Sequence, residues 1–316
     1  KPWNKARLSG IDKAQKDYNY LDKDNIEVFI YGYPYQDKKA SWISAYDVYQ
    51  MYLEIGTNFV NEIEGVYAIV ILNKVRNMCE VIIDCYGIYN LFYSKGENSF
   101  IISDNLAEIV SHMPHVKLNE RSIIEFLYFG FTIGDKTHIE GVYRFEPATV
   151  YRITGNLEIR GETYWEFYKE GRHRISRENF RRTFNEHVLT GLDLEERISL
   201  PLTGGIDTRT IFSACIPWKE KLHCYTHGLR DAKDVKLAKK ICKKFDVKHD
   251  VYTLDEKWVK NIPSMIRENV DIYNGMINLF WSLHLKNSYE KEQGKGELFF
   301  SGLMANEVWR IWFDHN

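Results

Sequence analysis

An apolar run that meets two glycines and then a polar helix start constrains the fold of this chain most strongly. Ile198 to Cys215 reads ISLPLTGGIDTRTIFSAC, with strand character first and helical character from Asp207 onward. Similar strand, loop and helix units follow at KLHCYTHG with DAKDVKLAKKICKKF and at KHDVYTL, before a short strand at GELFFSG. Successive units of this length predict a parallel sheet with right-handed crossovers.

The first half has the composition of short strands and turns. IEVFIYGYPY, EGVYAIVILN and MCEVIIDCYG are rich in β-branched and aromatic residues. Between the first two, Val48, Met51, Tyr52 and Ile55 recur at helical spacing before Gly56. We therefore predict an antiparallel α+β domain at residues 1–170 and an α/β parallel-sheet domain at residues 171–316.

Composition excludes several classes of protein. The 316 residues are 44% hydrophobic, which suffices for two cores. With 42 basic against 44 acidic side chains, the net charge of -2 gives no case for binding nucleic acid or an anionic membrane. The basic run KLAKKICKKF lies on a predicted helix and is explained as a solvated face. Its other face carries Val235, Ala238, Ile241, Cys242 and Phe245.

Neither a membrane span nor a disulfide framework is predicted. The longest apolar stretches are far shorter than the roughly 20 residues that a bilayer requires. The five cysteines form no CxxC pair, which disfavours disulfides and a zinc site. Reduced thiols in a cytoplasmic protein are the expectation.

The LTGGIDT loop lies where ligands bind in such sheets, beyond the carboxyl end of a strand. Gly204 and Gly205 permit a sharp turn and let backbone N–H groups approach an anion, and the helix start adds donors. Thr203 and Thr208 offer hydroxyls, and Asp207 suits Mg²⁺ held against a phosphate. No GK[ST] follows, so γ-phosphoryl transfer is disfavoured. Taken alone, the loop is equally well explained as an ordinary turn.

The surroundings of the loop carry a more specific resemblance. PLTGGIDTRT is similar to the SGGxDS pyrophosphate loop of ATP pyrophosphatases. CYTHG resembles the adenine-contacting turn, DAKDVKLAKKI the helix after it, and FFSGLMANE the second nucleotide loop. Segments of the first half, among them IIDCYGIYNLFYS, resemble successive parts of a class II amidotransferase domain. Their order indicates the asparagine synthetase-like family, with an Ntn-hydrolase-like N-terminal domain and a PP-loop synthetase domain.

The resemblance implies an ATP-dependent, AMP-forming ligase that activates a carboxylate as an acyl-adenylate, releases pyrophosphate and forms an amide bond. It implies ATP and Mg²⁺, a small-molecule or peptide carboxylate, and an amine or ammonia; a homodimer is a possible assembly. Asp207 is the expected catalytic residue and, with Asn306, the expected metal ligand. The expected nucleotide-binding residues are Leu202, Thr203, Gly204, Gly205, Asp207, Thr208, Thr226, His227, Gly228, Ser301 and Gly302.

The first half departs from glutamine-dependent members, which use an N-terminal cysteine and an Asn-Gly oxyanion hole. No cysteine precedes Cys79, and Tyr31-Gly32 takes the Asn-Gly position. Ala45 and Tyr46 stand near the place of the acidic residue that holds the glutamine amine. Loss of one oxyanion donor typically costs about 10²-fold or more in rate. We predict no glutaminase activity and a scaffolding or acceptor-binding role.

The second nucleotide loop also departs from the family. Leu303 stands in place of a catalytic glutamate, and leucine cannot transfer a proton. Asn306 replaces an aspartate that helps to hold magnesium. Glu307 is the nearest carboxylate, although pairing with Arg310 explains it equally well. Two alternatives therefore stay open: ammonia-dependent asparagine synthesis, and a catalytically degenerate nucleotide-binding partner protein.

Four other side chains have simpler explanations than ligand binding. His223 and His227 flank the turn after the second strand, where His227 could reach adenine but is better explained as a structural histidine. Tyr225 is expected in the core. Arg209 could meet a phosphate or point to solvent.

Overall fold

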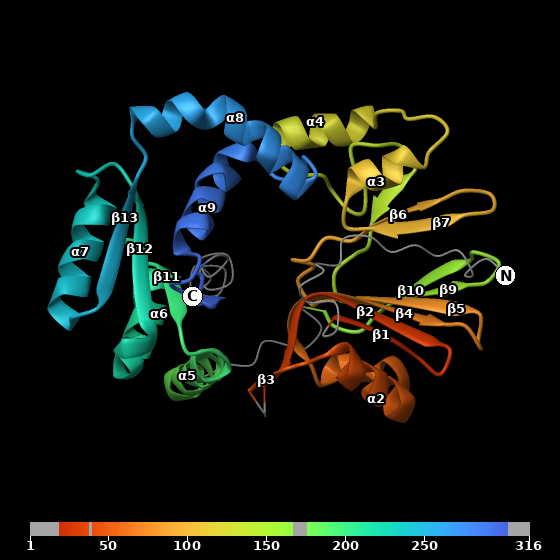
Figure 1. Ribbon diagram of the computed structural model, residues 1–316, viewed down its shortest axis with the longest axis horizontal. Helices are drawn as coiled ribbons and strands as arrows, with labels where there is room; N and C mark the ends of the chain where they lie inside the picture. Colours follow the sequence, from red (N-terminus) through yellow and green to blue (C-terminus); the bar gives the residue numbers. More distant parts are fainter. Residues whose placement is uncertain (1–18, 38–39, 167–175, 303–316) are drawn as a thin grey trace. The chain divides into compact units, whose positions relative to one another are not determined.

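The computed structural model describes residues 19–37, 40–166 and 176–302. The chain forms two compact units (Figure 1). The first comprises Lys1–Arg172 with Tyr273–Ile277, and the second comprises His173–Ile272 with Asn278–Asn316. Each unit has its own hydrophobic core and is described by itself.

The first unit contains two antiparallel sheets (Figure 1). The larger has the order β1 (Tyr20–Lys23), β2 (Ile26–Gln36), β4 (Glu64–Asn73), β5 (Met78–Ile83), β9 (Thr149–Thr154) and β10 (Ile159–Thr163), and β3 (Ser41–Trp42) pairs with β2. The smaller has the order β7 (Phe100–Ser103), β6 (Phe92–Lys95) and β8 (Val142–Arg144). The antiparallel sheets predicted for the first half are confirmed.

Strand periodicity divides the large sheet between two cores. Val28 and Ile30 of β2 pack on one face, and Phe29 and Tyr31 pack on the other. Because alternate residues of a strand point to opposite faces, a strand buried on both sides has to be apolar almost throughout. This requirement explains the continuous apolar runs in the sequence.

Helices α2 (Ala45–Ile55), α3 (Leu106–Ser111) and α4 (Glu120–Phe129), with the 3₁₀ helix η4 (Gly56–Asn61), complete the unit. Helix α2 covers one face of the large sheet, where Val48 and Tyr52 are buried as predicted, while Ile55 stays exposed at its end. Ser44 caps its start in a capping box, and Gly56 ends it with φ at 61°. The local sequence thus fixes both ends of this helix.

The small sheet lies between the other face of the large sheet and α3. Ile102 of β7 joins the core beneath the large sheet, and Phe92 of β6 joins a separate core with Leu106 and Ile109 of α3. The segment Tyr273–Ile277 also contributes to this unit, since Met276 is buried in the α3 core. The layers are therefore helix, sheet, sheet and helix.

The second unit is built on a parallel sheet of four strands. Their order is β13 (Lys248–Thr253), β12 (Leu222–Gly228), β11 (Ile198–Pro201) and β14 (Leu298–Phe299). The connecting elements are α5 (Arg177–Leu194), α6 (Ile206–Cys215), η5 (Ile216–Lys221), α7 (Lys233–Phe245), α8 (Glu256–Tyr273) and α9 (Leu279–Glu292). The parallel sheet expected from alternating strands and helices is confirmed.

The two faces of this sheet differ in chemistry. Helices α5, α6 and α7 bury an apolar core with Ile198, Leu200 and Cys224. Helix α9 lies on the opposite side in Figure 1 and contributes polar contacts to Ser199 and His223. Because Ser199 alternates with Ile198 and Leu200 along β11, one strand serves both faces.

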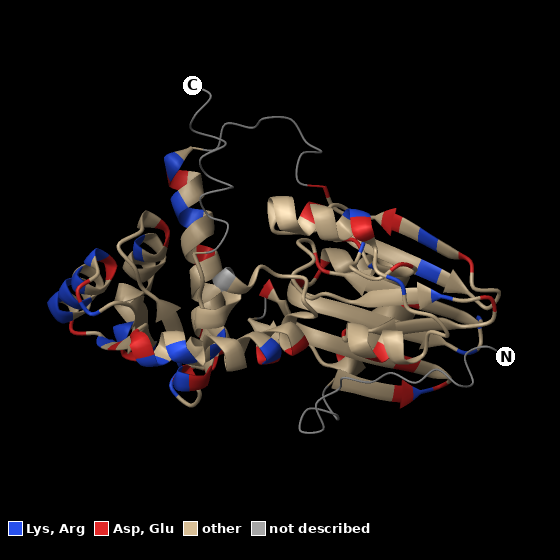
Figure 2. Cartoon of the chain, turned by 90° about the horizontal axis from the view of Figure 1, so that it is seen from above, with Lys and Arg blue, Asp and Glu red and all other residues tan. Residues whose placement is uncertain are grey.

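The basic run falls on the solvent-facing side of α7. Val235, Ala238 and Cys242 are buried as predicted, whereas Phe245 at the end of the helix is 38% exposed. The lysines of this helix are exposed, and Figure 2 shows basic and acidic residues interspersed in the second unit. This arrangement agrees with a solvated helical face.

Two further expectations can be compared with the structure. All five cysteines are free. Among the residues that the structure describes, no helix combines the length and apolar character needed to cross a lipid bilayer.

Candidate nucleotide site

The loop between β11 and α6 is anchored by a core residue. Leu202 is fully buried, and its N–H donates to the carbonyl of Tyr225 in β12 at 2.9 Å. Residues 203–205 therefore emerge at the carboxyl edge of the sheet. This is the edge where open parallel sheets bind ligands. Leu202 positions the loop from the core side.

The N–H groups of the loop already have acceptors within the protein. Thr203 N–H donates to Thr208 Oγ1 at 3.2 Å, and Gly205 N–H donates to Thr203 Oγ1 at 3.1 Å. Gly204 N–H donates to Asp234 Oδ1 at 3.0 Å, and Asp234 belongs to the first turn of α7. The loop is thus ordered by side chains, and one of them carries a negative charge.

The structure gives a different reason for the two glycines from the sharp turn expected at first. Neither is among the residues with positive φ. A Cβ on Gly204 would lie 2.5 Å from Asp234 Oδ1, whereas a Cβ on Gly205 would meet only Thr203 Oγ1 at 3.2 Å. A side chain at position 204 would therefore have to displace the Asp234 carboxylate, and Gly205 serves as the N-cap of α6.

The start of α6 can attract an anion. Gly205 is its N-cap, and no side chain caps the helix. The first N–H groups of a helix carry partial positive charge and bind anions when no cap occupies them. Asp207 lies in this first turn and is half-buried, and the exposed Arg209 donates through Nε to the carbonyl of Gly205 at 3.1 Å. A cation held by Asp207 would lie beside an anion bound at the helix start.

The segment after β14 meets the same helix start. Strand β14 pairs in parallel with β11, and Phe300 N–H donates to Ser199 O at 3.0 Å. A Cβ on Gly302 would lie 3.0 Å from Asp207 Cβ and 3.1 Å from Thr208 Cγ2. The structure thus brings Ser301–Gly302 against the first loop. Residues Leu303, Asn306, Glu307 and Arg310 lie outside the described residues.

Two residues expected at the nucleotide are used by the sheet itself. Thr226 is buried, and its hydroxyl donates to the carbonyl of Leu202 at 2.6 Å and lies 2.8 Å from His249 Nε2. Gly228 ends β12, and its carbonyl accepts from Leu254 N–H at 3.2 Å. The Thr226 side chain therefore fixes the end of β12 against β11.

His227 faces α9 near the carboxyl end of β12. Its ring lies 4.3 Å from that of His284, and its Nδ1 lies 3.4 Å from Ser288 Oγ. Burial, followed by the neighbouring His284, lowers the pKa of His227 to about 4. The imidazole is therefore neutral at neutral pH, so it offers a phosphate no positive charge.

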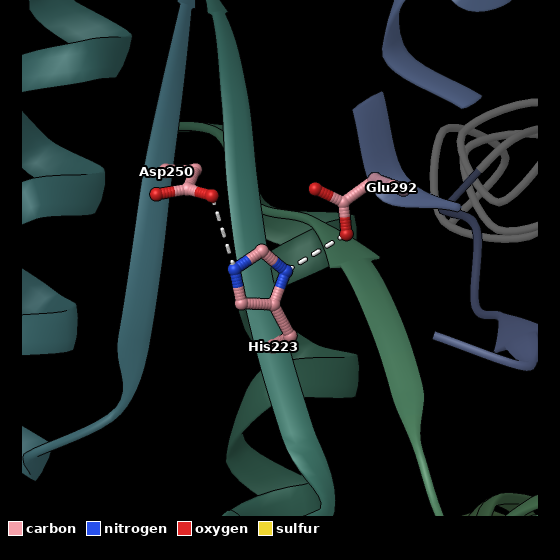
Figure 3. A group of neighbouring side chains, drawn as sticks. All are labelled: His223, Asp250 and Glu292. Atoms are coloured by element: carbon pink, nitrogen blue, oxygen red, sulfur yellow. Dashed lines mark hydrogen bonds and ion pairs between the residues drawn. The ribbon is translucent and has the colours of Figure 1, made fainter. Parts of the chain in front are cut away.

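A second polar cluster, missed from the sequence, surrounds His223, which lies four residues before His227 on β12 (Figure 3). His223 Nδ1 lies 2.8 Å from Glu292 Oε2, and His223 Nε2 lies 3.4 Å from Asp250 Oδ2. Glu292 is fully buried and also accepts from Ser199 Oγ at 2.6 Å and from the hydroxyl of Tyr252. We call these residues, together with Lys295, the His223 cluster.

The His223 cluster has the composition of a metal site but the geometry of an ion-pair network. One ligand atom each from His223, Asp250 and Glu292 lie within 4.8 Å of one another. However, the two ring nitrogens of His223 point to different carboxylates, so a single ion would have to displace one of these contacts (Figure 3). Lys295 Nζ also lies 2.5 Å from Asp250 Oδ2, which places a positive charge there already.

The electrostatics of the cluster favour an ionised glutamate. Burial raises the pKa of Glu292, but hydrogen bonds from His223, Ser199 and Tyr252 outweigh it and hold the pKa below the ordinary value. The pKa of Lys295 is raised by its hydrogen bonds to Asp250 and Tyr252, against the effect of burial. The cluster therefore holds the end of α9 on the sheet.

The Tyr31-Gly32 position, where the first half departs from a glutaminase site, and the first cysteine, Cys79, are both tightly packed. Tyr31 is buried, and burial raises its pKa. Gly32 has φ at 87°, and a Cβ there would lie 2.2 Å from Val66 O. Cys79 is 2% exposed within β5, and burial raises the pKa of its thiol. Cys79 is therefore a core residue and not an accessible nucleophile.

Comparison with known proteins confirms the expected resemblance. Residues 35–165 match the family model described as a glutamine amidotransferase domain. The chain is 26% identical over 249 residues to the glutamine-hydrolyzing asparagine synthetase 2 of Bacillus subtilis, which covers 70% of this chain and 33% of that protein. The chain is therefore similar to the asparagine synthetase-like family, and its first half is similar to a glutamine amidotransferase domain.

A second curated relative is less similar to the chain. The amidase chry2 of Gibberella zeae is 23% identical over 171 residues, covering 52% of this chain and 25% of that protein. The chain thus spans about a third or less of the length of these two relatives.

Two solved structures also resemble the chain. Glutamine PRPP amidotransferase of B. subtilis with ADP and GMP shares 9% identity over 73% of this chain and 46% of that one, at a TM-score of 0.25. Glutamine-dependent NAD+ synthetase of Acinetobacter baumannii with ADP shares 10% identity. The match covers 63% of this chain and 44% of that one, at a TM-score of 0.31. At such TM-scores neither similarity supports a conclusion about this chain.

Proposed function

We propose that this protein is an ATP-dependent ligase that activates a carboxylate as an acyl-adenylate and joins it to an amine. The observation that carries the proposal is the meeting of two loops within the second unit. Gly302 packs against Asp207 and Thr208 at the uncapped start of α6. Both segments that resemble nucleotide loops thus lie at the carboxyl edge of one parallel sheet, where ligands bind in such folds.

The residues of the loop have complementary roles in this proposal. The N–H groups at the start of α6 bind the pyrophosphate portion of ATP, aided by the hydroxyls of Thr203 and Thr208, which lie 3.2 Å apart. Asp207 would hold Mg²⁺, which when bound would supply positive charge against the leaving pyrophosphate. Asn306, the second expected ligand, would complete the site.

The proposed reaction has two steps, adenylation of the carboxylate and formation of the amide. A carboxylate oxygen attacks the α-phosphorus of ATP, and the bond to the bridging oxygen breaks to release pyrophosphate. The nitrogen of an amine or of ammonia then attacks the acyl carbon, AMP leaves, and the nitrogen loses a proton. Alignment of the two reactants supplies much of the rate enhancement in such a reaction. The free cysteines suit a reducing compartment, so we extend the proposal to a cytoplasmic enzyme.

We propose that the first unit lacks glutaminase activity despite its relationship to glutamine amidotransferase domains. The buried Tyr31 at the Asn-Gly position and the buried Cys79 support this proposal. The unit would instead act as a scaffold or help to bind the acceptor. Release of glutamate from glutamine by the purified protein would contradict it.

Isotope exchange between ATP and pyrophosphate tests the ligase proposal across a panel of carboxylic acids with Mg²⁺. We expect exchange with one class of acid and a loss of about 10²-fold or more in Asp207→Ala. Asp231→Ala is the matched control, because the Asp231 side chain is 95% exposed and forms a surface ion pair with Lys236. Exchange with aspartate alone, together with ammonia-dependent AMP formation, would favour asparagine synthesis. ATP binding without exchange would favour a degenerate nucleotide-binding protein.

A further inference from the structure

Asp234 accepts a hydrogen bond from the loop that is expected to bind an anion. Gly204 N–H is a donor that a phosphate oxygen would use, yet it donates to a carboxylate 30 positions further along the chain. The two groups come from different strand–helix units, the β11–α6 loop and the first turn of α7. The contact is therefore created by the tertiary fold and not by a local turn.

The position of Asp234 within α7 strengthens this observation. An acidic residue in the first turn of a helix usually stabilises the N–H groups of its own helix. Here Ala232 is the N-cap of α7, no side chain caps that helix, and Asp234 reaches across to Gly204. A Cβ at Gly204 would lie 2.5 Å from Asp234 Oδ1, so the carboxylate would have to shift to accommodate it. The fold thus holds a negative charge against the loop that is expected to receive phosphates.

We propose that Asp234 makes binding of a pyrophosphate-containing ligand at this loop depend on a divalent cation. The inference rests on the ligase proposal and adds a positioning residue to it. Without a cation, Asp234 remains the acceptor of the hydrogen bond from Gly204 N–H, and its negative charge repels the approaching phosphates. A cation held by Asp207 would neutralise much of the charge of the polyphosphate. A phosphate oxygen could then replace Asp234 as the acceptor of the hydrogen bond from Gly204 N–H.

The proposal distinguishes the two aspartates of the site. Asp207 lies in the first turn of α6 and attracts the cation, so its loss should weaken binding when Mg²⁺ is present. Asp234 opposes the bare anion, so its loss should strengthen binding when Mg²⁺ is absent. A residue that merely supports the loop would weaken binding in both conditions when removed.

Isothermal titration calorimetry with ATP, and separately with inorganic pyrophosphate, tests this difference in excess MgCl₂ and in EDTA. Asp234→Asn keeps an oxygen that can accept from Gly204 N–H but removes the charge, and Asp234→Ala removes both. We expect each variant to bind the metal-free ligands at least about tenfold more tightly than the wild type. Asp231→Asn, three positions away on an exposed side chain, should bind like the wild type.

The outcomes separate the inference from the ligase proposal. If the wild type binds ATP with Mg²⁺ but the Asp234 variants leave metal-free affinity unchanged, the inference is wrong and the ligase proposal stands. The same holds if the variants lose affinity equally with and without the cation. If the wild type binds neither ligand with Mg²⁺, both proposals fail. Asp234→Asn keeps the test decisive if Asp234→Ala does not fold.

Discussion

The β11–α6 loop and the His223 cluster are two polar regions of one sheet, and they satisfy their polar groups differently. In the loop, hydroxyls and one exposed carboxylate hold the N–H groups, and the start of α6 has no side-chain cap. In the cluster, Glu292 is fully buried and accepts from three side chains of three strands. The carboxylate that holds the loop is exposed, whereas Glu292, the central carboxylate of the cluster, is fully buried.

The comparison shows why composition alone does not identify a site. His, Asp and Glu together suggest a metal centre, but each of these side chains in the cluster has a protein partner. Among the described residues, the buried side-chain atoms without a partner are His138 Nδ1, Trp258 Nε1 and Asn269 Oδ1, all outside the cluster. A complete buried network stabilises a fold. A ligand site instead has accessible hydrogen-bond donors that can bind a ligand.

The largest effect on stability should follow from Glu292→Ala. The substitution leaves His223, Ser199 and Tyr252 without their shared acceptor, and loss of one partner from a buried charged network costs about 3–5 kcal/mol. Urea denaturation followed by circular dichroism measures the change in the free energy of unfolding. Glu290→Ala is the control, since Glu290 is exposed on the same helix and pairs with Lys286. Equal stabilities of the two variants would show that the cluster is not structural.

The sequence predicted the parts of the fold that local signals determine. The apolar run before Pro201, the paired glycines and the helical spacing after Asp207 are contiguous, so the strand–loop–helix unit and its place at a sheet edge could be predicted. The buried faces of α2 and α7 could be predicted for the same reason. Asp207 and Gly302 could be brought together only through the family resemblance.

The remaining contacts depend on sheet register and on distant segments. Ser199 meets His223 because β11 pairs with β12 in parallel, and Glu292 arrives 93 residues after Ser199. No spacing in the sequence signals that encounter. A single boundary near residue 170 likewise could not indicate that Asn274 belongs to the first unit. There it accepts from Leu106 N–H at 2.8 Å and so caps α3.

An intermediate effect is expected on the pH dependence of stability, through His227. Its folded pKa of about 4 lies below the ordinary value of 6.5, so protonation favours the unfolded state. Stability conferred by the neutral ring is therefore lost as the pH falls from 6.5 to 4 and changes little below that. His227→Asn should flatten the stability profile in this window, measured by urea denaturation at a series of pH values. The exposed His187→Asn should retain the wild-type slope, and a wild-type slope in His227→Asn would refute the assignment.

The smallest effects are expected from the two loop glycines, and they test whether α7 or the turn itself demands a glycine. In Gly204→Ala, the new methyl group has to displace the Asp234 carboxylate, and the lost charge-assisted hydrogen bond costs about 1–2 kcal/mol. Gly205 has φ at -64° and ψ at 153°, which alanine adopts without strain, so Gly205→Ala should change stability by less than about 0.5 kcal/mol. Urea denaturation of the two variants in parallel measures this difference. Equal costs at the two positions would mean that the conformation of the turn, and not the proximity of α7, selects glycine here.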